Sequence, residues 1–193
     1  MAVGAELLPH EGFDVLIDAM SRLPSAELIV VGGPRPSELA EDSDVARLSR
    51  LAADRAVSDR VHFTGALPWE RIPPLLRSAD LLACPSWYQA SAASVVEAMA
   101  CGIPVVASDA GGMRDTVVHE VTGLLVPPRD ARLLAAALRD VLDGGALRQG
   151  MGLAGRSRAL ACYSWQRVAA EAMVCYEKAM SYSAAPKRLI TAS

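Results

Sequence analysis

The chain has 193 residues, a hydrophobic content of 52% and a formal net charge of −3. This length suits one domain or one lobe of a larger protein, with a core filled by Ala, Val and Leu because aromatic residues make up only 5%. The acidic balance argues against nucleic-acid binding, and no apolar run reaches the roughly 18–20 residues of a membrane span.

The four cysteines lie at positions 84, 101, 162 and 175, and no two share the Cys-x-x-Cys spacing of zinc and redox motifs. Cys84 and Cys101 fall in apolar segments, which favours buried, reduced thiols and a cytoplasmic location. The first residues lack a basic region followed by an apolar core, so we expect no secretory leader.

Apolar strands and amphipathic helices alternate along the chain. Strands are expected at 1–8, 26–32, 60–65, 80–84, 104–108 and 123–126, and helices at 12–20, 45–55, 72–78, 92–100, 113–118, 130–142, 146–161 and 165–180. The alternation predicts one α/β, Rossmann-like domain over residues 1–182, with a parallel sheet of about six strands and helices on both faces. Residues 183–193 are expected to form a flexible tail.

Two local patterns predict further details of the carboxyl-terminal helices, an N-cap and a buried face. Ser164 is a suitable N-cap for the last helix. The helix at 130–142 is expected to turn an apolar face inward, made of Leu133, Leu134, Ala137, Leu138 and Val141.

In a parallel sheet of this type, ligands bind beyond the carboxyl ends of the strands. The loops expected to meet there are 5–12, 32–36, 65–69 and 85–94, with 109–114 alongside. The helix that begins near Ala92 or Ala93 follows a strand directly, so its free backbone N–H groups and positive dipole end favour an anion.

Several motifs occur together in a fixed order. They are Pro9-His10-x-Gly12-Phe13-Asp14, Val31-Gly32-Gly33-Pro34, Val61-x-Phe63-x-Gly65, Arg77-Ser78-Ala79-Asp80, Glu97-Ala98-Met99-Ala100-Cys101-Gly102-Ile103-Pro104-Val105-Val106-Ala107-Ser108 and Thr122-Gly123-Leu124-Leu125-Val126-Pro127. Nearly the entire chain thereby resembles the carboxyl-terminal, nucleotide-sugar-binding domain of retaining GT-B glycosyltransferases of family 4, the group 1 type.

The resemblance implies a UDP- or GDP-sugar as donor, transfer of a hexose with retention of configuration, and neither a metal nor another cofactor. It also implies a separate amino-terminal lobe that binds the acceptor, so this chain alone should not transfer sugar. Glu97 matches the family glutamate that binds the ribose hydroxyls, while Ala92 and Ala93 lie where the helix meets the diphosphate. The loop of Gly65 and Leu67 is expected to face the base through its backbone.

The positions that should contact the donor depart from the family pattern. Gln89 replaces a glutamate that places the donor sugar for transfer, and residues 90–92 read Ala-Ser-Ala instead of Pro-Phe-Gly. Glu6 and Glu11 occupy the positions of an arginine and a lysine that clamp the diphosphate. Two acidic residues should repel a polyanion and weaken binding. Arg35 and Arg114 are candidate substitutes, although both also suit solvated loop positions.

The motifs of the scaffold are intact while the polar donor contacts are changed. This combination fits a natural non-catalytic homologue, and it equally fits a deliberately edited, isolated lobe. Two functions therefore remain: a donor lobe of weakened affinity, or a domain that keeps the fold for binding, regulation or structure. A UDP-sugar 2-epimerase shares the two-lobed fold but matches these motifs less well. Trp87 and Tyr88 either stack on a ligand or pack against a second lobe.

Overall fold

The computed structural model describes residues 1–88 and 92–183. Its strands are β1 (Ala2–Val3), β2 (Leu28–Val31), β3 (Val61–Gly65), β4 (Leu82–Cys84), β5 (Val105–Ser108) and β6 (Gly123–Val126). The strand pairs are parallel and form two three-stranded sheets, in the orders β1-β2-β3 and β4-β5-β6. The predicted α/β architecture with parallel strands is therefore confirmed.

The two sheets meet at Met1. The amino group of Met1 donates to the carbonyl of Leu81 at 3.1 Å, and the N–H of Ala83 donates to the carbonyl of Met1 at 2.8 Å. In a parallel pair, a residue is hydrogen-bonded to the two residues that flank its partner on the other strand, and Met1 shows this pattern. The strands consequently follow one another in the spatial order 3-2-1-4-5-6, joined at the centre through this single residue.

The expected first strand, 1–8, is much shorter in the structure, because Ala2 and Val3 alone form β1. The chain leaves the sheet at Gly4, which still donates its N–H to Val31 at 3.0 Å. A Cβ atom on Gly32 would lie 1.6 Å from the carbonyl oxygen of Gly4, so this crossing requires a glycine with a φ of 119°.

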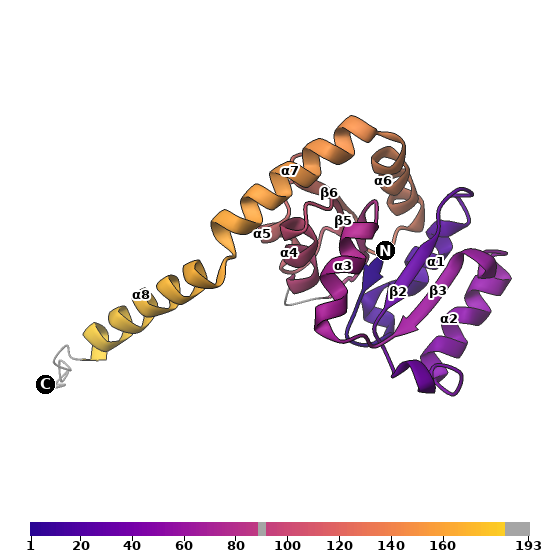
Figure 1. Cartoon of the computed structure of the whole chain (residues 1–193), viewed down its shortest axis with the longest axis horizontal. Helices are drawn as coiled ribbons and strands as arrows, with labels where there is room; N and C mark the ends of the chain where they lie inside the picture. Colours follow the sequence, from indigo (N-terminus) through magenta and orange to yellow (C-terminus); the bar gives the residue numbers. More distant parts are fainter. Residues whose placement is uncertain (89–91, 184–193) are drawn as a thin grey trace, which may run out of the picture.

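Helices cover both faces of the sheet (Figure 1). They are α1 (Phe13–Met20), α2 (Ser43–Asp54), α3 (Ile72–Ser78), α4 (Ala93–Ala100), α5 (Met113–Thr116), α6 (Ala131–Asp143), α7 (Gly145–Cys162) and α8 (Trp165–Ser183). Short 3-10 turns are η1 (Pro9–Glu11), η2 (Pro36–Glu38), η3 (Ser58–Arg60) and η4 (Trp69–Arg71).

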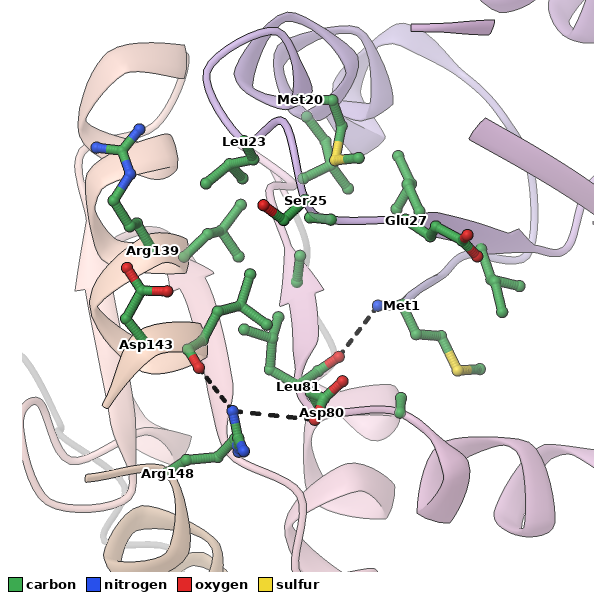
Figure 2. A pocket seen from close by; sticks show the side chains of 18 of the residues that line it. Met1, Met20, Leu23, Ser25, Glu27, Asp80, Leu81, Arg139, Asp143 and Arg148 are labelled. Atoms are coloured by element: carbon green, nitrogen blue, oxygen red, sulfur yellow. Dashed lines mark hydrogen bonds and ion pairs between the residues drawn. The ribbon is translucent and has the colours of Figure 1, made fainter. Parts of the chain in front are cut away.

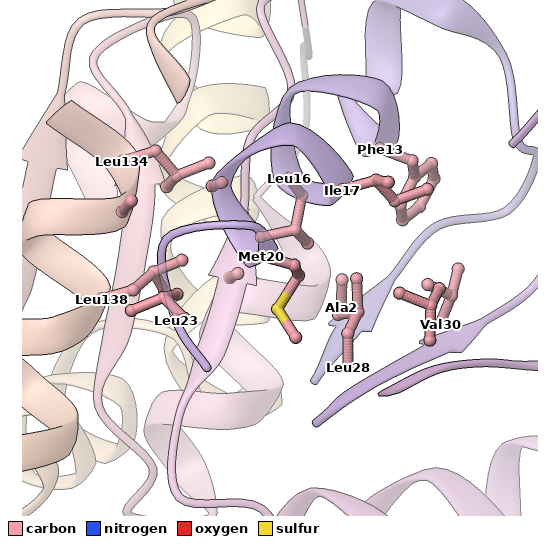
Figure 3. Packing of buried hydrophobic residues seen from close by; sticks show 14 of the residues in the cluster. Ala2, Phe13, Leu16, Ile17, Met20, Leu23, Leu28, Val30, Leu134 and Leu138 are labelled. Atoms are coloured by element: carbon pink, nitrogen blue, oxygen red, sulfur yellow. The ribbon is translucent and has the colours of Figure 1, made fainter. Parts of the chain in front are cut away.

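Two hydrophobic layers fill the interior, one on each face. The first joins α1, α2 and α6 to the strands, and in it Leu16 and Ile17 point toward Ala2 and Val30 (Figure 3). The second joins α3, α4 and α7 to the opposite face. Each layer contains residues from both three-stranded sheets, so the seam at Met1 is not a boundary between domains.

Side chains define where several helices begin. The carboxylate of Asp42 accepts the N–H groups of Asp44 and Val45, both at 2.9 Å, and Asp130 caps α6 in the same way. Ser164 accepts the N–H of Arg167 at 3.4 Å, which confirms it as the predicted N-cap of α8. The prediction for Leu133 is wrong: this side chain is 37% exposed because it lies at the edge of the inner face of α6.

The last helix extends away from the rest of the molecule (Figure 1). Trp165, Met173, Tyr176 and Met180 on α8 are all more than half exposed. No helix in the described part of the chain is both long enough and apolar enough to cross a membrane. The tail expected at 183–193 lies outside the described residues from position 184 onward.

Candidate functional site

The loops after the first four strands meet at the carboxyl edge of the sheet, as the strand pattern predicts. The N–H of Gly33 donates to the carbonyl of Ala5 at 3.3 Å, and the N–H of Ala66 donates to Pro34 at 2.7 Å. Backbone hydrogen bonds therefore hold the loops after β1, β2 and β3 together.

A pocket of about 400 Å³ opens between these loops and the start of α4. It is lined by Val3, Gly4, Ala5, Val31, Gly32, Ala66, Leu67, Ile72, Ala93 and Ser94. Of the residues singled out from the sequence, Leu67 and Ala93 line it, and Gly65 directly precedes the lining residue Ala66. Among the residues that the structure describes, none in the lining has an ionisable side chain, so the polar character of the lining comes from the backbone and from the hydroxyl of Ser94.

The first turn of α4 faces this pocket with Ala93 and Ser94. Ala92 is the N-cap, it is buried, and its side chain has no atom able to accept a hydrogen bond from the helix. The first N–H groups of a helix have no acceptor within the helix. These groups thus present a partial positive charge at the pocket, which is the attraction that its described lining residues offer an anion.

Glu6 and Glu11 lie on the loop that borders the pocket. Glu6 is exposed and follows the lining residue Ala5. The side chain of Glu11 is only 14% exposed. Its pKa is raised chiefly by burial, and the nearby Glu6 adds to this while His10 opposes it. Since the charges of Glu6 and Glu11 act on each other, the loop brings the two carboxylates together at the rim.

His10 and Glu11 sit in η1, which is fastened to the segment after β4. The carbonyl of His10 accepts the N–H of Trp87 at 3.0 Å and the hydroxyl of Ser86 at 3.2 Å. The imidazole Nε2 of His10 lies 3.8 Å from a carboxylate oxygen of Glu11. Because Gly12 has a φ of 75° and a Cβ there would be 2.3 Å from the carbonyl oxygen of Pro85, only glycine fits this junction.

Cys84 ends β4 beneath the same loops. Burial raises the pKa of its thiol to about 12, with a smaller contribution from the negative charge of Glu11. Hydrogen bonding with Ser86 and with Ser94 acts in the opposite direction. The thiol is protonated at neutral pH, so Cys84 serves packing here and not nucleophilic chemistry.

Glu97 lies one turn into α4, and Gln89 falls outside the described residues. The Glu97 side chain is exposed overall and is absent from the pocket lining. Even so, the packing around its carboxyl group raises its pKa by removing water. The structure therefore places Glu97 on the helix that begins at the pocket, without bringing it into the lining.

One of the two arginines that the sequence left as candidates, Arg114, is paired with another residue. Nε of Arg114 donates to Asp109 at 2.7 Å, on a loop beside the pocket. Sequence reasoning missed two others. Arg47 on α2 donates to the carbonyl of Leu7 at 3.0 Å and so braces the loop that carries Glu6 and Glu11. Arg129, after β6, lies over the ring of Trp87.

Trp87 contacts its own domain, which neither sequence interpretation anticipated. Its indole N–H donates to the carbonyl of Pro9 at 2.8 Å. Tyr88, in contrast, is 78% exposed. Among residues 1–88 and 92–183, no three His, Cys, Asp or Glu side chains gather closely enough to hold a metal ion.

Comparison with known proteins bears on this site. The profile described as "Glycosyl transferases group 1" matches residues 2–158. The D-inositol 3-phosphate glycosyltransferase of Mycobacteroides abscessus is 35% identical over 192 residues, which cover 97% of this chain and 41% of that protein. The chain thus spans well under half the length of this curated relative.

Two solved structures share the fold. The sucrose-phosphate synthase from Thermosynechococcus elongatus superposes with a TM-score of 0.84 at 33% identity, covering 94% of this chain and 45% of that one. The Anabaena protein HepE in complex with UDP-glucose gives a TM-score of 0.78 at 26% identity, covering 93% and 48%.

Proposed function

Because the chain belongs to the group 1 family of glycosyl transferases, we propose that it is the donor-binding lobe of a retaining hexosyltransferase whose affinity for the nucleotide diphosphate is weakened. The observation that carries the proposal is the pocket of about 400 Å³ at the first turn of α4. Its position beyond the carboxyl ends of the strands is where folds of this type bind nucleotides.

The nucleotide would lie with its base near Leu67 and its diphosphate at Ala93 and Ser94. Glu97, one turn further along α4, would accept hydrogen bonds from the ribose hydroxyls. HepE, a structural relative, was solved with UDP-glucose, which supports a nucleoside diphosphate sugar as the donor class. Gln89 would contact the sugar. The absence of a disulfide among the four cysteines accords with a reducing, cytoplasmic setting.

The acceptor would bind to a second lobe. This chain covers 41% of its curated relative, so most of that relative has no counterpart here. We therefore expect the 193-residue chain alone to transfer no sugar. The helix N-terminus stabilises an anion by only about 0.3–1 kcal/mol at an exposed site, which is too little to offset two carboxylates at the rim.

Titration calorimetry with UDP and GDP tests the proposal. Replacing Glu6→Arg together with Glu11→Lys should raise the affinity at least about tenfold, because a single charge-assisted hydrogen bond contributes roughly 1.5–3 kcal/mol. Ala92→Gly in that background should strengthen binding further by letting the backbone approach the diphosphate. The matched control makes the same charge changes far from the pocket, at Glu120 and Glu177, and should leave affinity unchanged.

The acidic rim also favours the second candidate, a domain that keeps the fold without binding a nucleotide. Under that alternative the Glu6→Arg, Glu11→Lys chain would fold normally and still bind neither UDP nor GDP. Micromolar binding of a nucleotide diphosphate by the unmodified chain would contradict our account of Glu6 and Glu11 instead.

A further inference from the structure

The nucleotide proposed above would extend along the carboxyl edge of the sheet, from β3 toward β4. Leu67, which would face its base, follows β3, whereas Ala93 and Ser94, which would hold its diphosphate, follow β4. The strand order places β1, and the loop 5–12 that follows it, next to β4. The outer phosphate of a bound nucleotide would therefore lie beside this loop.

Glu11 lies at the β4 end of this path. Its turn, η1, is fastened to the segment after β4, because Trp87 donates its N–H to the carbonyl of His10 at 3.0 Å. The negative charge of Glu11 acts on the thiol of Cys84, and the same thiol takes part in a hydrogen bond with Ser94, which lines the pocket. The carboxylate of Glu11 is thus close to the first turn of α4, where the outer phosphate would lie.

The negative charge at this end of the pocket is weakly screened. The side chain of Glu11 is only 14% exposed, so water and salt screen its charge less than they would at the surface. Glu6 adds a second carboxylate, and the charges of the two act on each other. The described lining residues carry no opposing charge, and His10, with Nε2 3.8 Å from Glu11, is the neighbouring side chain that opposes the pair when it is protonated.

Other carboxylates nearby and across the sheet are matched by arginines. Arg47, which braces the loop 5–12, is paired with Asp44 at 3.0 Å. A larger cavity, of about 750 Å³, lies at the opposite edge of the sheet, and its lining contains both acidic and basic side chains (Figure 2). These are Glu27, Asp80, Arg139, Asp143 and Arg148. The rim formed by Glu6 and Glu11 is therefore acidic in a way that this larger cavity is not.

The donor and the product of the proposed reaction present different charges to this rim. Transfer breaks the bond between the anomeric carbon and the outer phosphate oxygen, and it forms a bond from that carbon to the acceptor oxygen. The electron pair of the broken bond stays on the phosphate oxygen, and the acceptor hydroxyl releases its proton. A nucleoside diphosphate sugar carries two negative charges on its phosphates, and the diphosphate released from it carries a third above about pH 6.

We propose that Glu6 and Glu11 discriminate the donor from the product by this additional charge. The pocket then binds the nucleoside diphosphate sugar in preference to the nucleoside diphosphate that remains after transfer. This inference rests on the donor-binding function proposed above, and it gives the two carboxylates a selective role besides a general loss of affinity. In a complete enzyme, the same repulsion would favour release of the product.

Ligands that lack a sugar separate the charge from any contact with the sugar. UDP and GDP are each compared at pH 8 with their β-methyl esters, which carry one negative charge fewer. Titration of the 193-residue chain, followed through the amide resonances of Leu67 and Ser94, gives each dissociation constant and locates the ligand. The parent chain should bind the ester at least about fivefold more tightly than the free diphosphate, the effect of one unit charge on another at about 4 Å in water.

Variants then assign the discrimination to the rim. Glu6→Gln together with Glu11→Gln should tighten binding of both ligands and lower the preference for the ester at least about fivefold. The matched control, Glu120→Gln with Glu177→Gln, should keep the preference of the parent. Arg139→Gln, in the larger cavity, should leave both dissociation constants unchanged, and a loss of affinity there would show that the nucleotide binds at that cavity, which would overturn the inference.

Two further outcomes separate this inference from the proposed function. Equal affinity of the parent for the diphosphate and its ester, or the same preference in the double glutamine variant, would overturn the selective role of Glu6 and Glu11 while leaving donor binding intact. If neither the parent nor the Glu6→Arg, Glu11→Lys chain binds any of the four ligands, the proposed function is wrong and the inference fails with it.

Discussion

The guanidinium carbon of Arg129 lies 4.1 Å from the centroid of the Trp87 ring. Trp87 follows β4 and also donates its indole N–H to Pro9, while Arg129 follows β6 with a φ of 64°. Loops after the first, fourth and sixth strands are therefore tied together through one side chain. Trp87 and Arg129, neither of which lines the candidate pocket, therefore help to hold the turn η1, which carries Glu11.

Trp87→Phe should destabilise the chain by about 1 kcal/mol because it keeps an aromatic ring but removes the indole N–H that donates to Pro9. Arg129→Gln should cost about 0.5–1 kcal/mol, the usual range for an exposed cation–π pair. Urea unfolding at pH 7 measures both. Trp69→Phe is the control, since this tryptophan is 77% exposed, and an equal loss there would mean that the Trp87 contacts contribute nothing.

Glu11→Gln should stabilise the fold at pH 7. The pKa of Glu11 is raised in the folded state, so its contribution is fully favourable below the unfolded value of 4.5 and is lost as pH rises through the folded value. The amide avoids burying a charge beside Glu6. We expect a gain of several tenths of a kcal/mol at pH 7 and none at pH 4, the scale of weak surface charge effects.

Chemical unfolding of Glu11→Gln at the two pH values, beside Glu177→Gln as an exposed control, measures this difference. A variant that is less stable than the parent at pH 7 would show that the contact between Glu11 and His10 outweighs the burial of the Glu11 charge.

Two glycine substitutions should act in opposite directions. Gly12→Ala forces a Cβ to within 2.3 Å of the Pro85 carbonyl oxygen at a φ of 75°, so we expect a loss of more than about 2 kcal/mol. Gly150→Ala lies within α7, where a Cβ would meet no atom within 4 Å. It should gain about 0.5–1 kcal/mol from helix propensity. Thermal unfolding of both variants checks the pair.

Helix α8 should exchange its amide hydrogens far faster than α7. Its large apolar side chains are exposed, and most helical stability in proteins comes from tertiary packing of an apolar face, which α8 lacks along most of its length. Hydrogen exchange followed by mass spectrometry measures this. Deleting residues 165–193 should leave the unfolding midpoint unchanged, and a marked drop would mean that α8 stabilises the body of the protein.

The strands and the position of the pocket follow from the sequence because buried parallel strands are continuous apolar runs and their carboxyl ends share one edge. The segment 28–31 illustrates this: four apolar residues end at the glycines that turn the chain. The shortness of β1 could not be predicted from the sequence, because it depends on the close approach of Gly4 to Gly32, which is set by three-dimensional packing.

Side-chain partners at the rim were harder to anticipate. Trp87 and Arg129 are far apart in the sequence, and their contact depends on an unusual backbone angle at Arg129. Arg114 and Asp109 are only five residues apart, so their pairing is local in the sequence. Nothing in the sequence, however, distinguished a paired Arg114 from a solvated one.

The single-residue junction at Met1 has a consequence for dividing the protein into parts. Cutting the chain near residue 79 would separate the two three-stranded sheets while leaving each piece with part of both hydrophobic layers. Neither piece could cover its own core, yet the surfaces exposed by the cut are complementary. The two fragments should remain unfolded or aggregate when produced singly, and should recover the native fold when they are refolded together.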